Sequence, residues 1–125
     1  WSSDVCSSDL GFNNRIYRSE KRVLSRLEQI HTFIREDPAD PFNHYALAME
    51  LIRTDQPAAI EKFRSVIQDF PGYLPSYYTY ARLLYETGQS RQAATIADQG
   101  IVLAKEQADR KALGELRTLK AEIDL

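Results

Sequence analysis

Residues 75–104 read PSYYTYARLLYETGQSRQAATIADQGIVLA, a sequence typical of two amphipathic helices joined by a short turn. Pro75 opens the first helix, and Gly88 provides the left-handed residue that ends it. Ser90 is predicted to cap the second helix. The apolar positions at helical spacing are Tyr77, Tyr80, Ala81 and Leu84, then Ala93, Ile96, Ala97, Ile101 and Leu103. This stretch therefore predicts a helix–turn–helix unit.

The same unit recurs along the chain. A small residue follows a bulky one three times, and these small residues, Ala48, Ala81 and Gly114, lie 33 positions apart. A second set, Ala59, Phe63 and Pro71, has intervals of 4 and 8, and Ala93 and Ala97 repeat the first interval 34 positions later. A period of this length indicates stacked helical hairpins.

Further helices are expected on both sides of this stretch. A first helix presents one apolar face and is closed by Asp37-Pro38. Asp40 and Asp55 are predicted N-caps of two helices, and Asp109 is the predicted N-cap of the last. The apolar stripes are Leu24, Leu27, Ile30 and Ile34; Tyr45, Ala48, Leu51 and Ile52; Ile60, Phe63, Val66, Ile67 and Phe70; and Leu113, Leu116, Leu119 and Ile123. The fold class is therefore all-α, an α-solenoid of antiparallel helix hairpins with about six helices.

Residues 41–104 resemble two tetratricopeptide repeats (TPRs) of a short bacterial-type TPR protein. The TPR pattern has bulky, Leu-Gly and Tyr-like positions on helix A, followed by Ala-x3-Phe and Pro on helix B. The first unit matches it at His44, Leu47, Ala48, Leu51, Ala59, Phe63 and Pro71. The second unit matches it at Tyr77, Tyr80, Ala81, Leu84, Gly88, Ala93 and Ala97. We expect one domain over 23–125, with a half-repeat at 24–38, repeats at 41–72 and 74–105, and a capping helix at 110–123.

Three departures from the pattern suit the ends of a short array. Arg26 replaces a small residue, and Arg117 replaces an apolar one, as expected of end helices with one solvated side. Lys105 replaces the second closing proline, which permits that helix to run on. The predicted packing positions are Ala48, Ala59, Phe63, Pro71, Tyr80, Ala81, Gly88, Ala93, Ala97 and Gly114.

The first residues differ from the rest of the chain. Residues 1–10, WSSDVCSSDL, match the translation of a common sequencing-adapter tail residue for residue, and we expect them to be a non-native artefact. The alternative is a native disordered tail. Residues 11–22 are a polar lead-in, which is either native and disordered or translated from sequence upstream of the true start.

Composition excludes several function classes. The chain has 16 Lys and Arg against 18 Asp and Glu, which argues against electrostatic binding of nucleic acid. One Cys and two His are too few for a zinc site, so we expect neither a metal nor another cofactor. No apolar run reaches the length of a membrane span, and a cytoplasmic location is the default.

No catalytic set is recognisable, and we do not expect an enzyme. His31 and His44 lack a partnered nucleophile, so packing or surface roles are favoured over general-base chemistry. The carboxylates of Glu36 and Asp37 stand at a helix end beside a proline, where capping and solvation explain them. The five glycines are scattered and form no phosphate-binding loop.

Aromatic residues suggest a binding surface instead. Tyr78, Arg82 and Tyr85 share one face of their helix, at spacings of 4 and 3. One repeat earlier, the matching positions hold Tyr45, Met49, Ile52 and Arg53. The TPR resemblance implies that this helix-A face lines a concave groove. Tyr and Arg are enriched among interface hot spots, and Met adds adaptability. The structural alternative is that the tyrosines only fill gaps in the array.

We therefore expect a non-enzymatic protein–protein interaction module that binds a peptide or a partner helix on this face. The predicted contact residues are Tyr45, Met49, Arg53, Tyr78, Arg82 and Tyr85. The alternative hypothesis is self-association into a homo-oligomer through the ends of the array.

Overall fold

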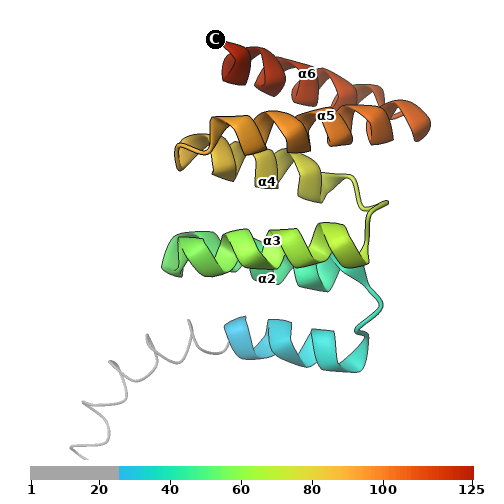
Figure 1. Ribbon diagram of the computed structural model, residues 1–125. Helices are drawn as coiled ribbons and strands as arrows, with labels where there is room; N and C mark the ends of the chain where they lie inside the picture. Colours follow the sequence, from blue (N-terminus) through green and yellow to red (C-terminus); the bar gives the residue numbers. More distant parts are fainter. Residues whose placement is uncertain (1–25) are drawn as a thin grey trace, which may run out of the picture.

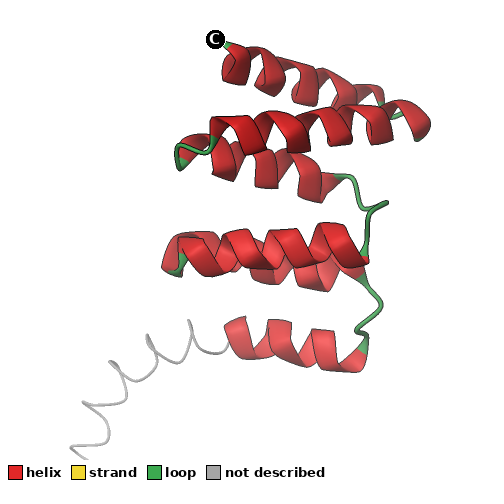
Figure 2. Cartoon of the chain, viewed as in Figure 1, coloured by secondary structure: helices red, strands yellow, loops and turns green. Residues whose placement is uncertain are grey.

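The computed structural model describes residues 26–125, where it contains helices and no strand (Figures 1 and 2). The first helix covers residues 26–36. The others are α2 (Pro41–Thr54), α3 (Gln56–Asp69), α4 (Pro75–Glu86), α5 (Ser90–Glu106) and α6 (Arg110–Asp124). The all-α architecture of six helices is thus confirmed for this part of the chain. The expectations for residues 1–10 and 11–22, and for Leu24, lie outside the described residues.

Three aspartates begin helices, as the sequence predicts. The carboxylate of Asp40 accepts a hydrogen bond from the backbone N–H of Phe42 at 3.0 Å. Asp55 accepts one from Ala58 at 3.2 Å, and Asp109 accepts one from the third residue of α6 at 3.0 Å. These bonds satisfy backbone donors that the first turn of a helix leaves without partners.

The predicted cap at Ser90 is wrong by one position. Ser90 is the first residue of α5, and Gln89 is the N-cap, without a side-chain hydrogen bond. The carbonyl of Gln89 already accepts the first helical bond from Ala93 at 2.9 Å, which makes Ser90 helical. The start of α5 is therefore set by the preceding turn rather than by a capping side chain.

Two turns between helices use the same left-handed geometry. Gly88 has φ +87°, as the sequence predicts, and the backbone N–H of Gln89 donates to Leu84 O at 2.8 Å. Ala108 has φ +55° in the next turn, where the N–H of Asp109 donates to Ala104 O at 3.0 Å. A left-handed alanine costs roughly 1–2 kcal/mol that glycine avoids.

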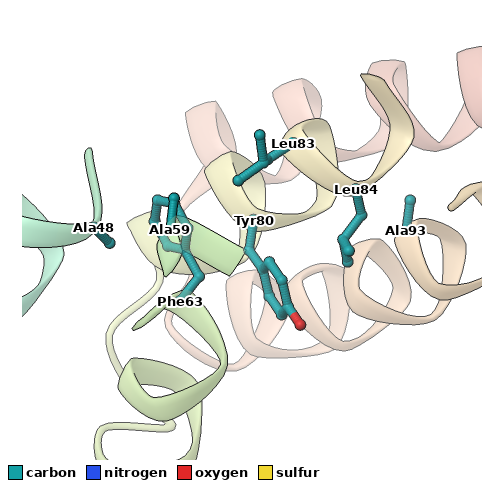
Figure 3. Packing of buried hydrophobic residues seen from close by; sticks show 7 residues of the cluster. All are labelled: Ala48, Ala59, Phe63, Tyr80, Leu83, Leu84 and Ala93. Atoms are coloured by element: carbon teal, nitrogen blue, oxygen red, sulfur yellow. The ribbon is translucent and has the colours of Figure 1, made fainter. Parts of the chain in front are cut away.

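The core runs through the stacked hairpins (Figure 3). Phe63 of α3 and Tyr80 of α4 stack with their ring centroids 6.0 Å apart. Small residues flank this pair and let the helices approach closely. Buried members of the cluster are Ala48, Ala59, Phe63, Tyr80, Leu83, Leu84 and Ala93. A second cluster joins Ala81, Ala97 and Leu119, so α4, α5 and α6 share one interior.

The prediction that Gly114 is a close-packing position is wrong. Gly114 is exposed, and a Cβ placed there would meet no atom within 4 Å. Its counterparts Ala48 and Ala81 lie against a following helix, whereas no helix follows α6 in the part of the chain that the structure describes. The glycine that does permit close approach is Gly100 of α5, where a Cβ would lie 2.8 Å from Tyr77 Cβ.

Two hydrogen bonds hold the turn between α3 and α4. The hydroxyl of Tyr77 donates to the carbonyl of Pro71 at 2.6 Å, while Pro71 itself is exposed just beyond the end of α3. The side-chain amide of Gln107, after α5, donates to the carbonyl of Gly72 at 2.8 Å. The turn between the two repeats is therefore held by both α4 and the turn that follows α5.

The residues that depart from the TPR pattern lie as the sequence predicts. Arg26 and Arg117 are both exposed. The helix that contains Lys105 extends one residue further, to Glu106. Figure 1 shows the helices stacked from the 26–36 helix at the bottom to α6 at the top.

Candidate functional site

Three hollows lie along α2, α4 and α6, which are the helix-A elements of the array. The first, of about 310 Å³, is bordered by all three helices. The second, of about 470 Å³, lies between α4 and α6, and the third, of about 120 Å³, lies between α2 and α4. Tyr78 lines all three, so the hollows form one surface, which we call the helix-A groove. Apart from Tyr78, its main lining residues are Tyr45, Thr79, Arg82, Lys111, Glu115 and Glu122.

Tyr45 joins the floor of the groove to the core. Its hydroxyl lies 2.9 Å from Thr79 Oγ1, and its ring meets Phe63 and Tyr73 edge-on at 6.1 and 5.6 Å. These contacts hold the half-buried ring in one orientation. The aromatic surface that Tyr45 presents is therefore largely pre-organised, which reduces the entropy cost of binding.

Tyr78 and Arg82 form the centre of the groove, one helical turn apart on α4. The Tyr78 phenol, together with the carboxylates of Glu86 and Glu122, raises the pKa of Arg82. Arg82 Nε also pairs with Glu86 Oε1 at 3.0 Å, with about half of the arginine side chain exposed. The guanidinium is thus a permanent, partly accessible cation beside an aromatic ring.

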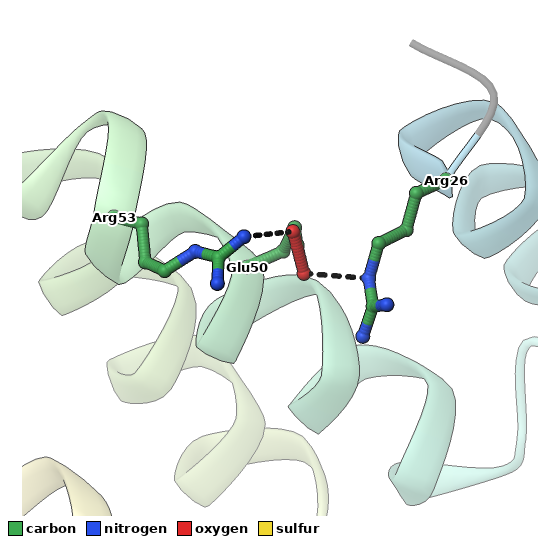
Figure 4. A network of polar contacts seen from close by, with 3 residues as sticks. All are labelled: Arg26, Glu50 and Arg53. Atoms are coloured by element: carbon green, nitrogen blue, oxygen red, sulfur yellow. Dashed lines mark hydrogen bonds and ion pairs between the residues drawn. The ribbon is translucent and has the colours of Figure 1, made fainter. Parts of the chain in front are cut away.

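Met49 and Arg53 lie on α2 but line none of these three hollows. Met49 is 42% exposed. Arg53 Nη2 lies 3.7 Å from Glu50 Oε1, and Glu50 Oε2 accepts a bond from Arg26 Nε at 2.9 Å (Figure 4). The Glu50 carboxylate therefore links the 26–36 helix to α2 and also pairs with Arg53.

Tyr85 is half-buried and also lies outside the three hollows. Its hydroxyl donates to the carbonyl of Glu122 at 3.4 Å, which joins α4 to α6. Of the six predicted contact residues, the structure thus brings Tyr45, Tyr78 and Arg82 together in the groove. The other three, Met49, Arg53 and Tyr85, line none of the three hollows.

The sequence prediction missed the wall that α6 contributes. Lys111 lies 33 positions after Tyr78, and Glu115 lies 33 positions after Arg82. Both residues are exposed and line the hollows. The repeat period applied a third time would have found them.

His44 has a packing role in the structure. Its Nδ1 lies 3.0 Å from Lys62 Nζ, and its Nε2 lies 2.9 Å from the carbonyl of Pro38. Its ring lies against Phe70 at a tilt of 36°, with the ring centroids 5.3 Å apart. Burial lowers the pKa of Lys62, and the charge of Asp69 partly offsets this effect. Both ring nitrogens of His44 are thus engaged in contacts that hold the 37–40 turn against the first hairpin.

Within residues 26–125, no group of three or more His, Cys, Asp or Glu side chains could hold a metal ion. Across the same range, every helix is too short or too polar to cross a membrane.

These features define a helical-repeat protein, and comparisons identify the family. The tetratricopeptide repeat family model matches residues 50–121. The crystal structure of a TPR domain protein from Salinibacter ruber is 30% identical, with a TM-score of 0.65, covering 68% of this chain and 97% of that one. Its solution structure is 32% identical, with a TM-score of 0.66, covering 70% and 90%. The chain belongs to the tetratricopeptide repeat family.

A more distant structure shares the fold. The TPR2B domain of yeast Sti1, solved in complex with pHsp70, is 15% identical, with a TM-score of 0.73, and covers 94% of each chain. No curated protein matches the sequence. The chain has the TPR fold, a non-enzymatic fold for protein–protein interaction.

Proposed function

We propose that this protein–protein interaction module binds an extended or helical segment of a partner protein in the helix-A groove. The observation that carries the proposal is the position of Tyr78, which lines all three hollows and has Arg82 beside it. Tyrosine and arginine supply large contact area and charge in one place, as interface hot spots do.

The groove offers different chemistry at its two sides. The side between α2 and α4 presents Tyr45 and Ile52, which suit apolar side chains of the partner. The side formed by α6 presents Lys111 and Glu115, which suit polar and charged ones. An acidic side chain of the partner would compete with Glu86 for Arg82.

The bound segment is therefore expected to combine apolar residues with at least one carboxylate. This composition differs from that of a ligand recognised by charge alone, because tyrosine rings form the floor. A mixed surface of this kind accommodates either an extended peptide or an amphipathic helix.

A phage-displayed library of random peptides tests the proposal. Peptides selected on the full chain are then measured against Tyr78→Ala with Arg82→Ala, and we expect the affinity to fall at least about tenfold. Arg64→Ala is the matched control, because Arg64 is an exposed arginine of α3 with a similar ion pair to Glu61.

Unchanged binding by the double variant, with its helical content intact by circular dichroism, would reject the groove as the site. Self-association through the ends of the array is the second hypothesis from the sequence. Light scattering of the unmodified chain at two concentrations tests it, since a homo-oligomer gains mass as concentration rises.

A further inference from the structure

The outer face of α6, made of Arg110, Leu113, Gly114 and Arg117, is a second surface with features of a docking site. These residues follow the spacing i, i+3, i+4 and i+7, so they share one side of the helix. The opposite side carries Leu116 and Leu119, which are buried against the array. Leu113 is half-buried against the cluster of Leu74, Ala104 and Leu116, whereas Arg110, Gly114 and Arg117 are exposed. Most of the outer face thus lies away from the side by which α6 packs.

The corresponding positions of α4 show what such a face does when it is covered. They lie 33 residues earlier, and all are buried: Tyr77, Tyr80, Ala81 and Leu84. Ala81 packs with Ala97 of α5, and Tyr77 Cβ lies close to Gly100 of α5. The α4 face therefore receives a helix that approaches closely at its small residue.

The outer face of α6 also has a small residue at its centre, but it carries charged residues where the α4 face has apolar ones. Gly114 stands in place of Ala81, and a Cβ placed on it would meet no atom within 4 Å. Arg110 stands in place of Tyr77, and Arg117 in place of Leu84. Two cations in place of apolar residues disfavour an apolar helix like α5 as the occupant, because their charges would be buried without partners.

An apolar hollow adjoins the face. It measures about 200 Å³ at the turn between α5 and α6 and is lined by Ala104, Ala108 and Leu113, with Lys105 and Arg110 at its rim. Asp109 also lines the hollow, and its carboxylate is engaged as the N-cap of α6. The hollow can accept an apolar side chain beside two cations.

The charge on this side is positive and open to solvent. Lys105, Arg110 and Arg117 are exposed. None of them forms an ion pair within 4.0 Å with another residue of the described range. A ligand with carboxylates at matching spacing would pair with them, and such pairs strengthen as water is excluded.

We infer that the outer face of α6 binds an acidic amphipathic helix of another protein. Its small apolar residues would pack at Gly114 and Leu113, and its carboxylates would pair with Arg110, Arg117 and Lys105. A second copy of this chain suits the face less well. Its 26–36 helix balances Glu28 and Glu36 against two arginines and so has no excess of acid.

This face adjoins the helix-A groove, because Arg110 and Gly114 also line the hollow between α4 and α6. Lys105, Leu113 and Arg117 line none of the three groove hollows, so variants at these positions separate the two sites. The probe is a synthetic amphipathic helix with alanine and leucine on one face and glutamate on the other. The control peptide carries lysine in place of every glutamate. Binding to the full chain is measured by fluorescence anisotropy at low and high salt.

We expect the glutamate peptide to bind and the lysine peptide to fail. Arg117→Glu combined with Lys105→Glu should weaken binding at least about tenfold, and added salt should weaken it too. Tyr78→Ala, in the groove, should leave it unchanged. Arg64→Glu on α3 is the control for reversing the charge of an exposed arginine.

Three outcomes would overturn the inference. The first is equal binding of the lysine peptide. The second is loss of binding in Tyr78→Ala, which would place the peptide in the groove. The third is a concentration-dependent dimer of the unmodified chain that Arg117→Glu abolishes, which would make a second copy the occupant. Circular dichroism of each variant confirms that α6 is still folded.

Discussion

The two hairpins of the array, α2–α3 and α4–α5, share a pattern but are stabilised differently. Both helices of the first hairpin begin at a capping aspartate, Asp40 or Asp55. Neither helix of the second hairpin has a side-chain cap. Conversely, α2 has only two buried residues, whereas α4 has six: Ser76, Tyr77, Tyr80, Ala81, Leu83 and Leu84. Local bonds thus contribute more to the first hairpin, and packing contributes more to the second.

The position of α4 in the stack explains this difference. It contacts α3, α5 and α6, so most of its surface is covered. Helices in this environment gain stability from apolar burial, at about 25 cal/mol per Å², and need caps less. The comparison leads to four predictions about stability.

The largest effect is expected from Ala81→Leu. Ala81 is fully buried between α5 and α6, so added carbons must force helices apart, at a cost near the upper end of about 1–3 kcal/mol. Thermal unfolding by circular dichroism measures the change. Glu61→Lys on the exposed side of α3 should stay within about 0.5 kcal/mol, and equal melting temperatures for the two variants would contradict the packing account.

Removing the caps of the first hairpin should rank second. Asp40→Ala combined with Asp55→Ala loses two side-chain bonds to backbone N–H groups, at about 1 kcal/mol each. Urea unfolding gives the difference in free energy. Gln89→Ala, at the uncapped start of α5, is the control and should change almost nothing. An equal loss of stability in Gln89→Ala would contradict the view that side-chain caps stabilise the first hairpin more than the second.

Replacing two helical glycines with alanine should change stability in opposite directions. Gly100→Ala should destabilise by about 1 kcal/mol, because the new Cβ would lie 2.8 Å from Tyr77 Cβ and the helices must shift. Gly114→Ala should stabilise by up to about 1 kcal/mol, because the position is open and alanine favours helix. Differential scanning calorimetry distinguishes them. A stabilised Gly100→Ala would show that α4 and α5 are less tightly packed there.

Tyr77→Phe should have the smallest effect at neutral pH. It removes the hydrogen bond to Pro71, which contributes about 1 kcal/mol or less. Burial raises the pKa of Tyr77, so above about pH 10 the unfolded chain releases this proton first. Stability of the unmodified chain should therefore fall as pH rises beyond that point.

Tyr77→Phe lacks the titrating hydroxyl. The difference in free energy of unfolding between the variant and the unmodified chain should therefore narrow at alkaline pH. Urea unfolding at pH 7 and at about pH 10.5 measures the change. A difference in free energy of unfolding that grows with pH would contradict the prediction.

Local chemistry made most of the fold predictable from sequence. Asp40, Asp55 and Asp109 identify helix starts because capping depends on residues close in the chain. The left-handed Ala108 could not be predicted in this way, because alanine disfavours positive φ and gives no sequence signal for it, unlike glycine.

The wrong prediction at Gly114 has a physical cause. Close approach depends on whether a second helix covers the position, and a repeat period gives no information on that. The groove was predictable only in part for the same reason. Spacing placed Tyr78 and Arg82 on one face, but the side chains that meet them from α6 depend on how the hairpins stack.

The bond between Gln107 and Gly72 affects how the array can bend. It fastens two successive turns at the same edge of the solenoid. A change in superhelical curvature that separates these two turns would break the bond, whose net contribution is about 1 kcal/mol. A ligand that binds best to an array with these turns further apart would therefore have to offset the loss of the bond between Gln107 and Gly72.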